Sequence, residues 1–189
     1  MPDEDFDALL STLQKTAVAL KEADIPFLLG GGLACWVRGG PESEHDLDLM
    51  IREEHAEAAL AALADAGMRT ERPPGEWLVK AWDDDVLVDL IFDPAGVPIT
   101  DAVFERADEL EVEAVAMQVM ALEDVLVTKL MALGEHNLDY ESVLEIARSL
   151  REQVDWEDVR ARSSESPYAL AFFTLVEGLG VAEPPRSGG

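Results

Sequence analysis

Three aspartates in two apolar segments are the residues best suited to chemistry. Asp46 and Asp48 alternate with leucines in a segment that then becomes wholly apolar, and Asp89 lies within the apolar run 86–92. Residues two apart in a strand point to the same face, so Asp46 and Asp48 should project side by side. Neighbouring carboxylates repel each other unless a cation lies between them, and oxygen-only ligands favour Mg²⁺ or Mn²⁺. The pattern therefore predicts a divalent-metal site.

Each part of this pattern also has a simpler explanation. An Asp-x-Asp pair alone is common on the solvated face of an ordinary strand. Asp89 alone could be a strand-end carboxylate paired with an arginine or lysine. Because a charge in a central strand is costly unless it is paired or binds a metal, Asp89 favours the metal site over the solvated face.

A glycine run and a few cations could serve phosphate groups. Gly31 and Gly32 follow a predicted strand over 27–29 and precede a predicted short helix over 33–37. Backbone N–H groups at such a turn can approach phosphate oxygens, although the run by itself predicts only a tight turn. The cations that could neutralise a triphosphate are Arg38, Lys80 and Lys129.

Hydrophobic periodicity predicts the elements that position these residues. Helices are expected over 5–23 and 53–66, and strands over 46–51, 68–72, 76–82 and 86–92. A last strand is expected over 112–120, followed by helices over 122–133, 140–150, 156–162 and 168–178, the last with Ser166 as its N-cap and Pro167 as its first residue. The predicted fold class is α/β.

Composition limits the class of protein. The 189 residues are 48% apolar, which suits one domain with a small helical annex, and the net charge of −26 disfavours broad binding to nucleic acid. The same charge would arise from selection for solubility or from a halophilic source. No segment is long and apolar enough to span a membrane, the N-terminus is acidic, and Cys35 is the single cysteine. We therefore expect a cytoplasmic protein.

The order of these motifs resembles the DNA polymerase β superfamily of nucleotidyltransferases. The resemblance covers residues 25–150 and lies closest to a small bacterial group that contains the abortive-infection toxins of type IV toxin–antitoxin systems. The residues that carry it are Gly31-Gly32-Leu33-Ala34, Asp46-Leu47-Asp48, Val88-Asp89-Leu90, Leu122–Leu130 with Lys129, and Asn137–Glu141.

The resemblance implies a fold and a reaction. The fold would be a small, mixed and mostly antiparallel sheet with flanking helices (1–120), a C-terminal helical bundle (121–182) and a flexible tail (183–189). The reaction would move an NMP from an NTP to an acceptor hydroxyl with two Mg²⁺ ions. Asp46, Asp48 and Asp89 would hold the metal, with Asp89 taking the acceptor's proton. Gly31 and Gly32 would position phosphates, and Lys129 would neutralise charge.

The sequence departs from the family where the chain approaches Asp46. The segment Glu42-Ser43-Glu44-His45 lacks the basic residues usual there. One alternative is therefore a catalytically silent module that binds a cognate protein partner, and another is a plain α/β protein with an acidic surface. In an active enzyme, the acceptor could be a small cationic molecule, a protein or tRNA, the last disfavoured by charge. His45 should face away from the metal, and Trp77 or Trp82 could line the acceptor pocket.

Overall fold

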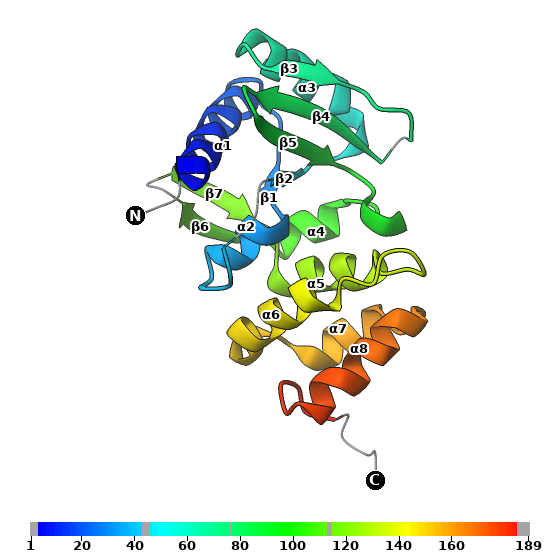
Figure 1. The fold of residues 1–189 in the computed structure, drawn as a ribbon. Coiled ribbons are helices and arrows are strands. Elements are labelled where there is room, and N and C mark those ends of the chain that lie inside the picture. The colour runs from blue at the N-terminus through cyan, green and yellow to red at the C-terminus, as the bar shows by residue number, and fades with distance from the viewer. Residues whose placement is uncertain (1–3, 43–45, 76, 113–114, 185–189) are drawn as a thin grey trace.

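A computed structural model describes residues 4–42, 46–75, 77–112 and 115–184. Helices and strands alternate through the first two thirds of the chain, and helices alone follow (Figure 1). The elements are α1 (Glu4–Glu22), β1 (Leu28–Leu29), α2 (Gly31–Trp36), β2 (Asp46–Met50), η1 (Glu53–His55), α3 (Ala56–Asp65), β3 (Arg69–Glu71), β4 (Leu78–Asp83), β5 (Val86–Ile91), η2 (Pro94–Gly96), α4 (Asp101–Glu105), β6 (Asp108–Val112), β7 (Val115–Val119), α5 (Leu122–Met131), α6 (Tyr140–Leu150), η3 (Arg151–Gln153), α7 (Trp156–Arg162) and α8 (Pro167–Gly178).

The described strands form one seven-stranded sheet in the order β3-β4-β5-β2-β1-β7-β6. Strand β2 pairs with β5 in parallel, as β1 does with β7, and the other four neighbouring pairs are antiparallel. The mixed, mostly antiparallel sheet with flanking helices that the resemblance implied is therefore confirmed.

The two faces of the sheet differ in chemistry. One face of β2, β5 and β4 carries a group of apolar side chains without exposed surface: Leu47, Leu49, Val79, Ala81, Val88 and Leu90. Helices α1 and α3 contact these strands and form the covering layer on this side (Figure 1). Since side chains alternate along a strand, the opposite face receives the aspartates of β2 and β5.

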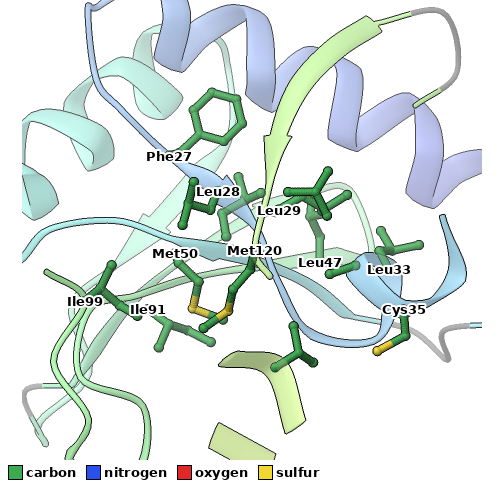
Figure 2. Close-up of a cluster of buried hydrophobic side chains, with 14 of the residues drawn as sticks. Phe27, Leu28, Leu29, Leu33, Cys35, Leu47, Met50, Ile91, Ile99 and Met120 are labelled. Carbon is green, nitrogen blue, oxygen red and sulfur yellow. The ribbon is translucent and has the colours of Figure 1, made fainter. Parts of the chain in front are cut away.

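The core continues through β1, which lies between β2 and β7. Leu28 and Leu29 are fully buried, and Leu28 stands opposite Met50 in the antiparallel β1–β2 register. Figure 2 shows Met50 and Met120 projecting to the same side, close to Ile91. This apolar cluster holds β1 against β2 and so positions the glycine turn, which follows β1, beside β2.

The C-terminal helices attach to the sheet through a buried ion cluster. Asp124 of α5 is 1% exposed and accepts hydrogen bonds from Arg106 at 2.9 and 3.0 Å and from Arg162 of α7. Ser166 caps α8 by accepting from the Ala169 N–H, and Pro167 is its first residue, as predicted. Apolar residues of α5 to α8 belong to the same buried cluster as those of the sheet.

The largest difference from the predicted elements lies between β5 and α5. The strand expected over 112–120 is present as β7 over Val115–Val119, but β6, the antiparallel strand that precedes it and pairs with it, was not expected. Strand β6, over 108–112, is acidic and largely exposed. It therefore lacks the apolar run that would have predicted a strand. The division at residue 120 stays a prediction, and residues 185–189 of the predicted tail lie outside the described residues. No helix in the described part of the chain could span a membrane.

Candidate functional site

Three charged side chains form a row across the face of the sheet opposite α1 and α3. Asp48 of β2 stands opposite Asp89 of β5, and Asp89 stands opposite Lys80 of β4. Asp46 lies two residues before Asp48 and therefore projects from the same face. Asp48 and Asp89 are 41 residues apart in the sequence, and the parallel, in-register pairing of β2 and β5 brings the predicted aspartates onto one face of the sheet.

The glycine turn lies directly against Asp48. The Gly30 N–H donates to the Asp48 carbonyl at 2.9 Å, and α2 begins at Gly31, whose φ is +56°. A Cβ atom on Gly31 would lie 1.9 Å from Asp48 Oδ2. Only glycine allows both this backbone conformation and this close approach of the carboxylate.

The three carboxylates interact electrostatically. Burial raises the pKa of Asp48 to about 6, with further raising by the charges of Asp89 and Asp46, while Lys129 and Lys80 act in the opposite direction. Burial and Asp46 also raise the pKa of Asp89, against the lowering effect of Lys80. A cation placed between these carboxylates would relieve the repulsion, so their oxygens fit a divalent metal ion.

The three carboxylates are not close enough together in this structure to enclose a metal ion. No three His, Cys, Asp or Glu side chains within the described residues converge closely enough to hold a metal ion. Asp89 instead contacts Lys80, with 3.1 Å between Nζ and Oδ1. The carboxylate oxygens of the three aspartates therefore suit a metal ion, but the positive charge that contacts Asp89 is the Lys80 ammonium group.

Two cavities meet beside Asp48, and both are lined by Asp48 and Lys129. The first, of about 550 Å³, is acidic and is lined mainly by polar side chains: Gly32, Pro41, Glu42, Asp46, Asp48, Lys129, Asp139, Glu141, Ser142, Glu145 and Ile146. It lies between α2, β2 and the helices α5 and α6. Five of its lining residues besides Asp48 are carboxylates, so it favours a cationic ligand.

The second cavity, of about 630 Å³, is largely apolar. Its lining includes Met50, Trp77, Ile91 and Met131, together with Gly31 and the 93–96 turn. The Trp77 side chain is 47% exposed, whereas the other three are more deeply covered. Such a surface suits a flat, uncharged ring.

The remaining predicted residues are distributed differently. Arg38 donates to the Ala34 carbonyl and to Asp108 and lines neither cavity. Trp82 stacks against Arg69, with 3.7 Å from the guanidinium carbon to the ring centroid. Cys35 is fully buried, and burial raises its pKa to about 11. His45 lies outside the described residues.

The acidic side chains of α6 were missed as site residues from the sequence. Glu141 and Glu145 lie four residues apart, so they share one face of the helix and line the acidic cavity together with Asp139. Their spacing was visible in the sequence. That this face turns toward β2 depends on the packing of α6 against α5, which the sequence does not reveal.

The comparisons with known proteins agree with this arrangement. A family model described as "Nucleotidyl transferase of unknown function (DUF2204)" matches residues 9–168. The chain belongs to this family. It is therefore a nucleotidyltransferase, and the enzyme class inferred from the ordered motifs is confirmed. No protein with curated function matches the sequence.

Solved structures similar to this nucleotidyltransferase share its fold. The solution structure of the antibiotic-resistance factor ANT(2″)-Ia is 14% identical, with 93% of this chain and 99% of that chain covered and a TM-score of 0.65. The crystal structure of ANT(2″)-Ia in complex with adenylyl-2″-tobramycin is 18% identical, with 89% and 98% covered and a TM-score of 0.59. A putative nucleotidyltransferase from Thermotoga maritima is 19% identical, with 66% and 84% covered and a TM-score of 0.53. The narrower resemblance to abortive-infection toxins stays a prediction.

Proposed function

We propose that this nucleotidyltransferase transfers an NMP from an NTP to a hydroxyl group of a small cationic acceptor, in a reaction that depends on Mg²⁺ or Mn²⁺. The observation that carries the proposal is the position of Asp48, which lines both an acidic and an apolar cavity and stands opposite Asp89 in the β2–β5 register. Transfer needs two substrates to meet at one point, and this junction offers separate space for each.

The metal would be held by Asp46, Asp48 and Asp89. When bound, it supplies positive charge to the triphosphate and lowers the pKa of the acceptor hydroxyl. Two observations support these residues as ligands: the raised pKa of Asp48, caused first by burial and then by the charges of Asp89 and Asp46, and the close approach of its carboxylate to Gly31. Arg38 lines neither cavity, so its predicted nucleotide contact is not part of the proposal.

The chain's own residues then orient the reactants. In the transfer, the acceptor oxygen forms a bond to the α-phosphorus, the bond from that phosphorus to the bridging oxygen breaks, and pyrophosphate leaves. Asp89 takes the hydroxyl proton, and Lys129 at the junction offsets charge on the phosphates. The apolar cavity beside Trp77 would accommodate the nucleoside, because binding there removes the flat ring of the base from water, which is favourable.

The acidic cavity would accommodate the acceptor. Its carboxylates, Glu42, Asp139, Glu141 and Glu145 among them, attract ammonium groups and repel phosphate backbones, which argues against tRNA as the acceptor. Since ANT(2″)-Ia was crystallised with an adenylylated aminoglycoside, an amino sugar is a sensible first acceptor to test.

A labelling experiment tests the proposal. The protein is incubated with each α-³²P-labelled NTP, Mg²⁺, and either a hydroxylated amino sugar or its neutral analogue. We expect label on the amino sugar from one preferred NTP, and none with Asp48→Asn. Equal labelling of both acceptors would contradict the cationic acceptor. If Asp48→Asn were as active as wild type, the proposed site would be wrong. A thermal shift unchanged by Mg²⁺ and every NTP would indicate a silent scaffold.

A further inference from the structure

Lys80 contacts the Asp89 carboxylate, which is one of the three proposed metal ligands. Its Nζ lies 3.1 Å from Asp89 Oδ1, and the two residues are direct partners in the antiparallel β4–β5 register. The Asp89 side chain is 14% exposed and that of Lys80 27% exposed, so the ion pair is partly shielded from water. Shielding strengthens the attraction between the two charges relative to a surface pair.

Lys80 differs from its neighbours on this face of β4. Leu78 is buried, and Trp82 stacks against Arg69. Lys80 is thus the residue of this strand that brings a mobile positive charge to the row of Asp48 and Asp89. It also lowers the pKa of both aspartates.

We propose that Lys80 is an internal counter-ion for Asp89, which a divalent metal ion must displace before Asp89 can become a ligand. This inference rests on the proposed function, because it takes the three aspartates to be the metal ligands. An ammonium group and a divalent ion at the same carboxylate repel each other, so metal binding and the Lys80–Asp89 contact compete.

Manganese binding without nucleotide tests this competition. Free Mn²⁺ is measured by electron paramagnetic resonance during titration of wild type, Lys80→Met and Lys80→Arg. We expect Lys80→Met to bind Mn²⁺ about tenfold more tightly, because the competing charge is gone. Lys80→Arg should stay within about twofold of wild type, since it keeps the charge.

A matched control separates this contact from a general effect of charge. Lys15 of α1 forms an ion pair with Asp83 of β4, on the face covered by α1 and α3. Lys15→Met removes one positive charge and one ion pair, as Lys80→Met does, yet it should leave Mn²⁺ affinity unchanged. Equal tightening in both variants would overturn the proposal.

Thermal unfolding gives a second readout. In EDTA, Lys80→Met should melt at a lower temperature than wild type, because Asp89 loses its counter-ion, and Mn²⁺ should raise its Tm by more than it raises that of wild type. Lys80→Gln, a polar replacement, covers the case in which the methionine variant does not fold.

The outcomes distinguish this inference from the proposed function. Mn²⁺ binding to wild type with unchanged or weaker affinity in Lys80→Met and Lys80→Gln overturns the counter-ion role alone. The same holds if those variants raise the KM for the NTP and leave Mn²⁺ affinity unaltered, because Lys80 then serves the phosphates. Failure of every variant to bind Mn²⁺ overturns both the counter-ion role and the metal site.

Discussion

Gly31 and Asp48 contact each other so closely that a single added methyl group would not fit between them. The Gly31 Cα carries no side chain, and a Cβ there would lie 1.9 Å from Asp48 Oδ2. The backbone at Gly31 also has a φ of +56°, which non-glycine residues adopt only at a cost. The glycine turn and the aspartate strand are therefore one structural unit.

Replacing Gly31 with alanine should abolish most of the transfer activity. The methyl group would force the Asp48 carboxylate out of the row, and we expect kcat/KM to fall by about 100-fold or more, as when a group that positions the reaction is displaced. Activity is measured in the labelling assay. Gly39→Ala is the matched control, because Gly39 also has a positive φ of +88° but has open space around its Cα. Equal loss of activity in both variants would show that backbone strain, and not the contact with Asp48, is responsible.

The ionisation of Asp48 should make the metal-free protein less stable as the pH rises. The folded-state pKa of about 6 lies above the reference value of 3.8, so the native state holds the extra proton between these values. Stability therefore falls from pH 4 to pH 6 and then levels off. Asp48→Asn should be more stable than wild type by about 2 to 3 kcal/mol at pH 7, with no gain below pH 4. Urea unfolding in EDTA across this range measures the difference, and saturating Mg²⁺ should reduce it.

Lys129 should influence both catalysis and the pH profile. It lines both cavities and lowers the pKa of Asp48. Lys129→Met should lower kcat/KM by about 10- to 100-fold and move the acidic limb of its pH dependence to higher pH. Lys129→Arg should retain the position of that limb. A limb that does not move in Lys129→Met would contradict the electrostatic link between the two residues.

The acidic face of α6 should determine affinity for the acceptor. Glu145 lines the acidic cavity, so Glu145→Gln should raise the KM for a cationic acceptor about fivefold and leave the KM for the NTP unchanged. Steady-state kinetics with each substrate varied in turn provide the test. Glu152→Gln, at an exposed residue of η3 outside the cavity, is the control. An effect of Glu145→Gln on the NTP alone would place the nucleotide in the acidic cavity.

The attachment of the C-terminal helices should depend on Asp124. This side chain is 2% exposed and pairs with both Arg106 and Arg162, so Asp124→Ala removes the ion pair of Arg106 and leaves Arg162 with Asp158 alone. We expect the free energy of unfolding to fall by about 3 kcal/mol or more. Asp158 pairs with Arg162 as well but is 42% exposed, so Asp158→Ala should cost less than about 1 kcal/mol. Denaturant unfolding of both variants provides the comparison.

The local sequence pattern was sufficient to predict the two strands that carry the aspartates of the site. Alternation around Asp46 and Asp48 gave β2, and the apolar run around Asp89 gave β5. Their parallel pairing and exact register could not be obtained from either segment alone, because register depends on how the sheet is assembled. The ordered motifs of the family resemblance supplied that missing long-range information.

Long-range contacts account for what the sequence did not reveal. Lys80 was predicted as a phosphate-binding cation, and only the β4–β5 register shows that it pairs with Asp89. Likewise, β6 is an acidic segment with no strong strand pattern, and it is a strand because β7 lies beside it. Tertiary neighbours decide both cases.

The shortness of β1 affects how the two parts of the sheet can move relative to each other. Two residues, Leu28 and Leu29, connect the β3-β4-β5-β2 part of the sheet to β7 and β6 within the described strands. A twist of one part against the other would be concentrated at this narrow joint. Since Gly31 follows it by a single intervening residue, such a twist would act first on the spacing between the backbone of α2 and the carboxylate of β2.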